Sequence, residues 1–578
     1  MALRSRLAAL AALLTLLAPV AQAQGVGRDT PVRPVTRTLA LTNARVVVAP
    51  GRVLDRATVV VRDGRIEAVG RDVAVPFDAE AIDADSLTVY AGFVDALGYA
   101  GVPKAEDDER PEDIDRGAPP RELAGIVPDR DVRTDYDASD ARIGQLREAG
   151  FTAAHVAPRD GLFSGQGAVV LLRDLGRLET TPAVVLTEPI SLVARMDPAR
   201  GVYPATPMGV LAVMREAVEN ARRRQTSRTA FDEAREGTAR PRFDPVLDAL
   251  APALGGQRVF VFAVENSLDG FRALRASEEM GLRPVLAGAP DVTALLPRLR
   301  ETETPVFAPL ALPDTVKADS AALALPVPQT TPGAVSFISN RRTISFRDTD
   351  AERSILTGQR RAAVARAEAN AAALAGAEVP FAFATLDVKP ADVHTNLRRM
   401  VRAGLSPDDA LAALTTAPAR LLGIDREVGT VEVGKLANLV VTTGDLFTSD
   451  STRVRHVVVD GVRYEVEAGG GPEGADPDAV VQAAGTWDYE VPTPGGTQEG
   501  TFTVEGSEGS YTGSITGQGE TDPMTSVTVA GNVLTFSFQS DEVGTVTVTG
   551  TIDGDAFSGT VELAQFGSFP FTATRRPE

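Results

Sequence analysis

The sequence has no cysteine, three histidines and only four lysines among its 578 residues. The lack of cysteine excludes disulfides, thiolate nucleophiles and zinc or iron–sulfur sites with cysteine ligands. Positive charge is also scarce, because 58 Lys and Arg stand against 78 Asp and Glu, which gives a net charge of −20. Nucleic acids and anionic membranes bind clustered positive charge. We therefore expect neither of them as a partner.

Long apolar runs are missing after the first 23 residues, so no membrane span is expected beyond them. The N-terminus itself carries Arg4 and Arg6, a short apolar run from Leu7 to Val20, and the triplet Ala21-Gln22-Ala23. This order is typical of a cleaved signal peptide, although a retained amphipathic helix would also fit it. We expect residues 1–23 to be a signal, 24–38 a linker, and the mature protein to be exported to the periplasm or the extracellular space.

The body of the chain is predicted to be an α/β barrel that carries a small β domain. Its length calls for several domains, because single cores stop growing at about 250–300 residues. Apolar strands alternate with helical patterns over residues 91–424, which favours a TIM-like (β/α)8 barrel. Short strand patterns flank this region at 39–90 and 425–466. We expect these two ends to form one composite β-sandwich domain.

The C-terminal region has a different composition. Residues 467–484 contain a Gly-rich run and are expected to be a linker. Residues 485–578 are rich in Gly, Thr, Ser and Val, with alternating apolar positions and turn signals about every ten residues. This pattern predicts an all-β barrel or sandwich of about eight strands.

Several motifs of the body occur together in one known group of proteins. They are Asn43-Ala44-Arg45, the run from Asp63 to Gly70, Ala91-Gly92-Phe93-Val94-Asp95-Ala96, Ser164-Gly165-Gln166-Gly167-Ala168, the run from Ala413 to Gly423, and the run from Gly429 to Val440. Over about 39–466 the chain thereby resembles the amidohydrolase superfamily, and within it the imidazolonepropionase-like branch. The resemblance implies a barrel enzyme that hydrolyses non-peptide C–N bonds, such as those of cyclic amides, with one or two divalent metals.

The resemblance also implies where metal ligands would stand, and most of those positions hold other residues. The two histidine positions after strand one hold Leu97 and Tyr99, and Phe262 stands where a strand-five histidine would fall. Strand six ends in Gly288-Ala289-Pro290. Only Asp387 matches a ligand position. We therefore predict no bound cofactor, and a divalent metal only if the family chemistry survives.

Two carboxylates remain as candidate catalytic groups. Asp387 and Glu265 both follow apolar strands, as does Glu188, and Lys389 is close to Asp387 in sequence. A pair of carboxylates can perform general acid/base catalysis. The alternative is that Glu265 caps the helix that begins at Ser267, and that Asp387 pairs with Lys389 or an arginine.

The three histidines do not form an obvious set. His155 ends the second barrel strand, His394 lies on a helix after Asp387, and His456 precedes a strand of the small β domain. We expect each of them to be structural or on the surface. The C-terminal region resembles, more weakly, lipocalin-like barrels, in which Trp487 would be a core residue or a ligand contact.

Three functions stay open from the sequence. The first is a degenerate, non-catalytic family member that acts as a subunit or as a partner of a metal-bearing relative. The second is an active C–N hydrolase with an unusual site around Asp387. The third is a small-ligand-binding protein. A small-molecule substrate or ligand, and homo- or hetero-oligomers, are the expected partners.

Overall fold

The computed structural model describes residues 37–104, 114–175, 184–197, 199, 201–234, 239–314, 349–386, 388–449, 452–466 and 481–576, the last range with short gaps at loops. The chain divides into two compact units, Met1–Glu465 and Val466–Glu578. Each unit is considered by itself. None of the helices in the described part of the chain is long and apolar enough to cross a membrane.

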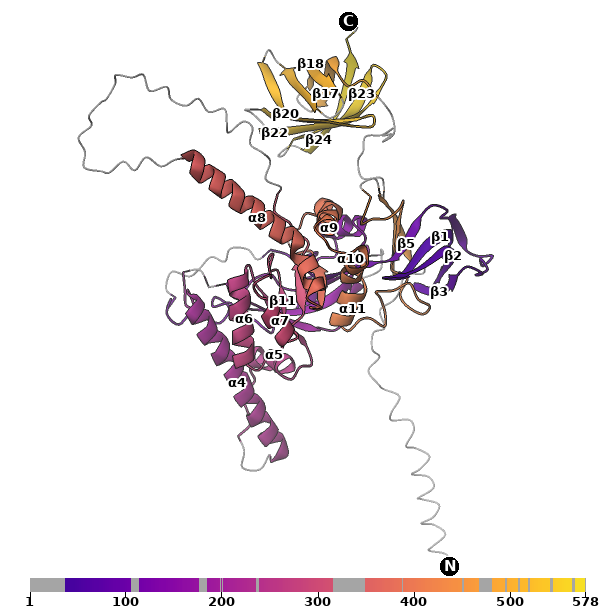
Figure 1. The fold of residues 1–578 in the computed structure, drawn as a ribbon. Helices are drawn as coiled ribbons and strands as arrows, with labels where there is room; N and C mark the ends of the chain where they lie inside the picture. The colour runs from indigo at the N-terminus through magenta and orange to yellow at the C-terminus, as the bar shows by residue number, and fades with distance from the viewer. Residues whose placement is uncertain are drawn as a thin grey trace, which may run out of the picture. The chain divides into compact units, whose positions relative to one another are not determined.

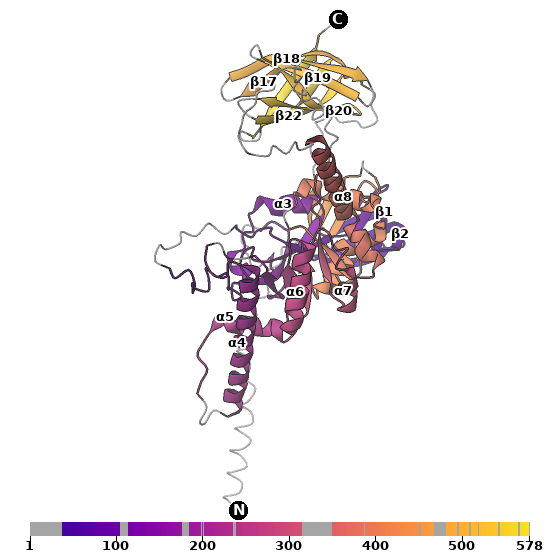
Figure 2. The ribbon, with the colours of Figure 1, turned by 60° about the vertical axis from the view of Figure 1, so that its left-hand side comes forward.

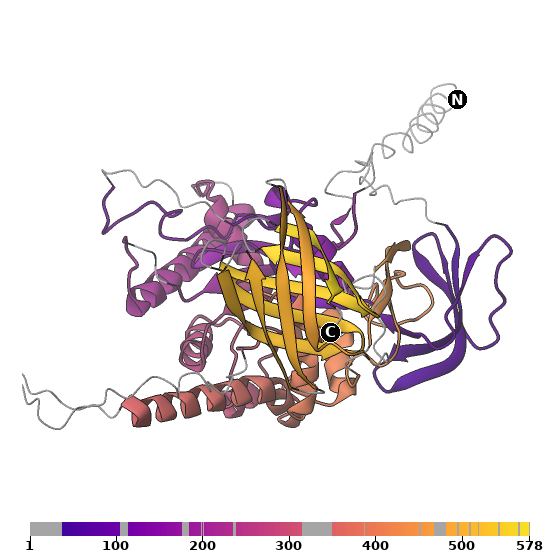
Figure 3. The same ribbon diagram turned by 90° about the horizontal axis from the view of Figure 1, so that it is seen from above.

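Both ends of the larger unit contribute to one β domain, as predicted. Its sheet has the order β16-β15-β14-β5-β1-β2-β3, with β4 paired to β1. Figure 3 shows the late strands beside the indigo N-terminal ones, and β14 pairs antiparallel with β5. The strands are β1 Leu39–Ala49, β2 Arg52–Arg62, β3 Arg65–Gly70, β4 Glu80–Asp83, β5 Thr88–Ala91, β14 Leu439–Thr442, β15 Val454–Val459 and β16 Val462–Glu465.

A tight turn at Asp63-Gly64 joins β2 to β3. Both residues have positive φ, of 50° and 73°, as a two-residue hairpin turn of the right twist requires. The apolar faces of the strands then meet in one core, which contains residues from both ends of the unit, among them Val46, Val59 and Leu439.

The body is an eight-stranded barrel, in the order β13-β12-β11-β10-β9-β8-β7-β6. Its first and last strands meet through a parallel bridge between Gly98 and Leu386. Seven strands share one direction, but β8 runs antiparallel to both β7 and β9. The strands are β6 Phe93–Gly98, β7 Phe151–Val156, β8 Phe163–Leu171, β9 Ser191–Arg195, β10 Val259–Ala263, β11 Pro284–Ala287, β12 Val306–Pro309 and β13 Phe381–Ala384.

Helices connect the barrel strands and cover the outside of the barrel (Figures 1 and 2). They are α2 Val132–Asp135, α3 Ala141–Glu148, α4 Pro207–Glu233, α5 Pro245–Leu254, α6 Ser267–Glu279, α7 Leu296–Glu301, α8 Thr349–Gly376, η3 Pro390–Asp392, α9 Val393–Arg402, α10 Pro407–Leu414 and α11 Thr416–Leu421. The α/β barrel class predicted from the sequence is confirmed, with β8 as the strand that departs from a uniform (β/α)8 pattern.

The smaller unit is a closed barrel of eight antiparallel strands. Figure 2 shows its gold and yellow strands. The strands are β17 Gly485–Thr493, β18 Gly496–Ser507, β19 Ser510–Gly517, β20 Glu520–Ala530, β21 Val533–Ser540, β22 Gly544–Asp553, β23 Ala556–Leu563 and β24 Gly567–Arg575. This confirms the predicted C-terminal all-β barrel.

Aromatic rings fill the middle of the small barrel. Trp487 is fully buried and stacks on Phe502 at 5.9 Å between ring centroids, while Phe536 and Phe557 approach Phe502 from other strands. The Trp487 Nε1 donates to the Ala483 carbonyl at 3.2 Å. Trp487 is therefore a core residue with a satisfied N–H, as expected for one of its two predicted roles.

Candidate functional site at the barrel mouth

The carboxyl ends of the seven parallel strands meet at one end of the barrel, which is where sites lie in this architecture. Strand β6 brings Leu97 and Tyr99 to this end. Leu97 is fully buried, and Tyr99 has only 5% of its surface exposed. The Tyr99 hydroxyl accepts a hydrogen bond from Nη1 of Arg195, the last residue of β9, at 3.1 Å. Neither side chain is available as a good metal ligand, since one is alkyl and the other is a phenol bound to a cation.

A buried carboxylate that the sequence reasoning missed closes the barrel. Asp95 on β6 is fully buried, and its Oδ1 accepts from the backbone N–H groups of Leu97 and Thr385 at 3.1 and 2.8 Å. Its Oδ2 accepts from the Thr385 hydroxyl at 2.5 Å. Burial raises the pKa of Asp95 to about 6 against the opposing effect of these hydrogen bonds. The sequence did contain a signal for this role, because an aspartate within an otherwise apolar strand must find hydrogen-bond partners when it is buried.

The segment after β13 is held from two sides. Leu386 donates its N–H to the Leu97 carbonyl at 3.1 Å and has a φ of 41°, a conformation that is costly for a large side chain. The Nη2 of Arg142 donates to the carbonyls of Leu386 and Val388, both at 2.9 Å. Asp387 lies between these two residues but outside the described residues, so its predicted role stays a prediction.

Glu265 follows β10 and is exposed to solvent. It does not cap the next helix, which was the alternative role considered for it. The cap of α6 is Asn266, whose Oδ1 accepts from the N–H of Asp269 at 3.0 Å. The amide is favoured there because it satisfies a free N–H of the first turn. The catalytic role predicted for Glu265 stays untested, and Glu188 is an exposed partner of Arg133 at 2.6 Å.

The three histidines lie in three separate places. His155 is fully buried in the barrel, its Nδ1 2.7 Å from the Ala96 carbonyl and its Nε2 2.7 Å from the Ser191 hydroxyl. Because a carbonyl only accepts, Nδ1 carries the proton and Nε2 accepts from Ser191. Burial lowers the pKa of His155 to about 4, so the ring is neutral. His394 bonds the Ala149 carbonyl at 2.9 Å, and His456 lies on β15.

The predicted strand-five and strand-six positions are also apolar. Phe262 on β10 is fully buried and packs edge-to-face with Phe260 at 5.8 Å. Ala289, after β11, is fully buried as well. Within the described residues, no group of three His, Cys, Asp or Glu side chains could hold a metal ion. The donor set in this part of the chain does not fit a divalent metal.

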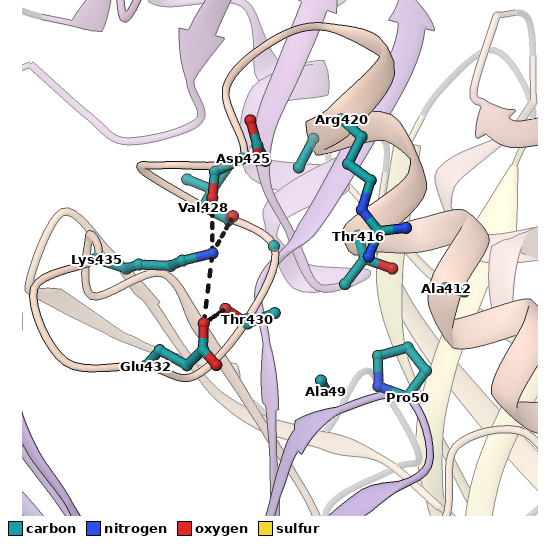
Figure 4. A pocket seen from close by; sticks show the side chains of 12 residues that line it. Ala49, Pro50, Ala412, Thr416, Arg420, Asp425, Val428, Thr430, Glu432 and Lys435 are labelled. Atoms are coloured by element: carbon teal, nitrogen blue, oxygen red, sulfur yellow. Dashed lines mark hydrogen bonds and ion pairs between the residues drawn. The ribbon is translucent and has the colours of Figure 1, made fainter.

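A cavity of about 510 Å³ lies elsewhere in the larger unit, between the turn after β1, helices α10 and α11, and the loop at 425–435 (Figure 4). On one side, Lys435 donates its Nζ to the Asp425 and Val428 carbonyls at 2.7 and 3.3 Å, and Glu432 lies 3.8 Å away. Arg420 of α11 lies across the cavity. Because its lining residues do not come from barrel strands, this cavity is separate from the barrel mouth.

Comparison with known proteins gives one sequence match and a set of similar folds. Residues 300–463 match the amidohydrolase family. An amidohydrolase from Thermotoga maritima MSB8 shares 20% identity at a TM-score of 0.57, covering 74% of this chain and all of that one. A molinate hydrolase shares 15% identity at a TM-score of 0.39, covering 75% of this chain and 96% of its own. No curated protein sequence matches.

The sequence match and the fold agree on one part of the molecule. The matched residues run from the end of α7 into β16, and so include the barrel strands β12 and β13 and the C-terminal strands of the β domain. The Thermotoga structure shows that the larger unit has an amidohydrolase fold. Residues 300–463 thus match the amidohydrolase family in sequence, and the larger unit has the fold of an amidohydrolase.

Proposed function

We propose that this protein is an amidohydrolase-family member whose metal site is degenerate, and that it acts as a non-catalytic subunit or as a partner of a metal-bearing relative. The main support for the proposal is that neither strand-one position holds a side chain available to bind a metal. Leu97 offers no donor atom, and Tyr99 is bound to the Arg195 guanidinium. His155, the histidine on barrel strand β7, has both ring nitrogens in hydrogen bonds.

The direct test is the metal content of the purified full-length chain. After dialysis we expect less than about 0.1 Zn, Fe or Mn per chain by inductively coupled plasma mass spectrometry, since structural and catalytic sites with complete ligand sets keep their metal. A zinc hydrolase dialysed in parallel is the control. One metal ion per chain that survives dialysis would overturn the proposal.

An active C–N hydrolase centred on Asp387 is the second candidate, and one observation favours it. Arg142 and Asp95 together hold the backbone on both sides of position 387, and Leu386 keeps a strained conformation there. Such strain is often found at functional sites. Turnover of cyclic imides, lactams or dipeptides that is lost in Asp387→Ala would support this candidate. Equal activity of the variant would refute it.

We also propose that the protein is exported, with cleavage after Ala23. The charged start, short apolar run and small-residue triplet support this. N-terminal sequencing of protein made in a bacterial host should give Gln24 as the first residue of the periplasmic material. An intact N-terminus in the cytoplasmic fraction alone would contradict it.

A further inference from the structure

We propose that the barrel mouth beside Tyr99 binds an oxyanion, a carboxylate or phosphate group of a small molecule, through Arg195 and Arg159. This inference deepens the proposed function and rests on it only in that the mouth holds no metal. It assigns a ligand class to the end of the barrel where the strand-one positions hold Leu97 and Tyr99.

Two guanidinium groups from different strands converge on one buried ring. Arg195 ends β9 and donates its Nη1 to the Tyr99 hydroxyl at 3.1 Å. Arg159, just after β7, lies over the Tyr99 ring at 4.5 Å from the centroid and donates its Nη2 to the Tyr99 carbonyl at 3.3 Å. Tyr99 thus contacts both guanidinium groups, which lie at the carboxyl ends of β7 and β9.

Two hydrogen bonds fix the orientation of the Arg195 guanidinium and leave its Nη2 for a ligand. Its Nε bonds the half-exposed Asp197 at 2.6 Å and its Nη1 bonds Tyr99. Among the described residues, no hydrogen bond uses its Nη2. The side chain is only 22% exposed, so a charge here acts through a lower dielectric than on an open surface. A planar guanidinium held in this way matches the geometry of a carboxylate or phosphate.

The same two cations disfavour a divalent metal at this place. A guanidinium and a metal ion within a few ångströms repel each other, whereas an anion is attracted by both arginines. Among the described residues that contact Arg195, Asp197 supplies a negative charge, and it occupies the Nε edge of the guanidinium. The attraction must be local, because the chain as a whole carries a net charge of −20. Binding of an anion here would therefore indicate a specific site formed by these two arginines, because general electrostatic attraction by the acidic chain would not produce it.

The test is calorimetric titration of the full-length chain, stripped of metals on a chelating resin, with succinate and separately with inorganic phosphate in about 0.1 M NaCl to screen distant charges. We expect saturable binding of one of the probes at one site. Arg195→Gln should weaken it at least about tenfold, the loss of one charge-assisted hydrogen bond, and Arg159→Gln should weaken it as well. Tighter succinate binding would identify a carboxylate ligand, and tighter phosphate binding a phosphorylated one.

Arg147→Gln is the matched control. Arg147 also lies over a tyrosine ring, that of Tyr464 at 3.8 Å, and also pairs with an aspartate, Asp174 at 2.9 Å, but it belongs to α3. Its loss should leave probe binding unchanged. The inference is overturned if neither probe binds at up to about 10 mM, or if folded Arg195→Gln and Arg159→Gln bind like the parent chain. With a metal content near zero, that result would leave the proposed function intact.

Discussion

At the scale of single residues, the barrel interior holds two titratable groups whose pKa values burial moves in opposite directions. Asp95 has its pKa raised to about 6, and His155 has its pKa lowered to about 4. Between about pH 4 and 6 the folded chain therefore keeps a proton on Asp95 that the unfolded chain releases. Over the same range the unfolded chain keeps a proton on His155 that the folded chain lacks. The two contributions to the pH dependence of stability nearly cancel.

Removing either group should reveal how the other one makes the free energy of unfolding depend on pH. In His155→Gln, the free energy of unfolding of the larger unit should rise, relative to the parent, as the pH falls from 6 to 4. In Asp95→Asn it should fall over the same range. Each slope is up to about 1.4 kcal/mol per pH unit. Urea titrations followed by far-ultraviolet circular dichroism at pH 4, 5 and 6 measure both, and parallel curves for the three proteins would contradict the buried positions of these side chains.

At the scale of elements, local chemistry decides where a helix begins and ends. Ser406-Pro407 starts α10, with the Ser406 hydroxyl accepting from the N–H of Asp409 at 3.0 Å. The helical stretch that follows is divided into α10 and α11 at Thr415, whose backbone leaves the helical region. The reversed direction of β8 could not be foreseen, since an apolar strand has the same pattern in either direction.

The candidate site was less predictable than the elements that carry it. The resemblance placed Leu97 and Tyr99 at the strand-one positions, and both lie at the barrel mouth. The partners of Tyr99 were not predicted, because Arg159 and Arg195 lie 60 and 96 residues away from it along the chain and approach it only through strand order. Asp95 was noted only as part of a motif, because its role depends on Thr385, which directly follows the last barrel strand, β13.

A buried ion pair joins the barrel to the β domain, and we expect it to stabilise the larger unit. Arg173 follows β8 and lies with its Nε 3.7 Å from Asp460, which follows β15, and both side chains are less than 5% exposed. Arg173→Ala should lower the free energy of unfolding of the larger unit by about 3–5 kcal/mol, because it leaves a buried carboxylate without this cation. Denaturant unfolding followed by circular dichroism measures the loss.

Two further variants distinguish the loss of this buried ion pair from the general effect of removing a charge. Arg275→Ala removes a surface partner of Glu279 on α6 and should cost less than about 0.5 kcal/mol. Arg173→Met combined with Asp460→Asn removes both charges and should recover part of the stability, with Asn suited to the positive φ of 51° at position 460. If Arg173→Ala costs no more than Arg275→Ala, the ion pair does not stabilise the junction.

At the scale of the whole molecule, the two units have separate cores. The core of the smaller unit takes all its residues from 483–573. The only tryptophan, Trp487, lies in that core, whereas all the described helices belong to the larger unit. Tryptophan fluorescence therefore reports unfolding of the small barrel, and the helical dichroism signal near 222 nm reports unfolding of the larger unit. The two probes give separate access to the two units within one intact chain.

Phe536→Ala should destabilise the small barrel and leave the larger unit unchanged. Phe536 is fully buried and approaches Phe502 and Phe571 but makes no ring contact with Trp487 among the described residues, so the reporter keeps its stacked neighbour. Loss of a buried phenylalanine typically costs about 3–5 kcal/mol. The fluorescence midpoint in urea should therefore shift down, while the dichroism midpoint stays where it was. Phe538→Ala, at a partly buried position of the same strand, should shift the fluorescence midpoint less. If Phe536→Ala shifts both midpoints together, the two units unfold as one cooperative body, because only a shared transition transmits the loss from one core to the other.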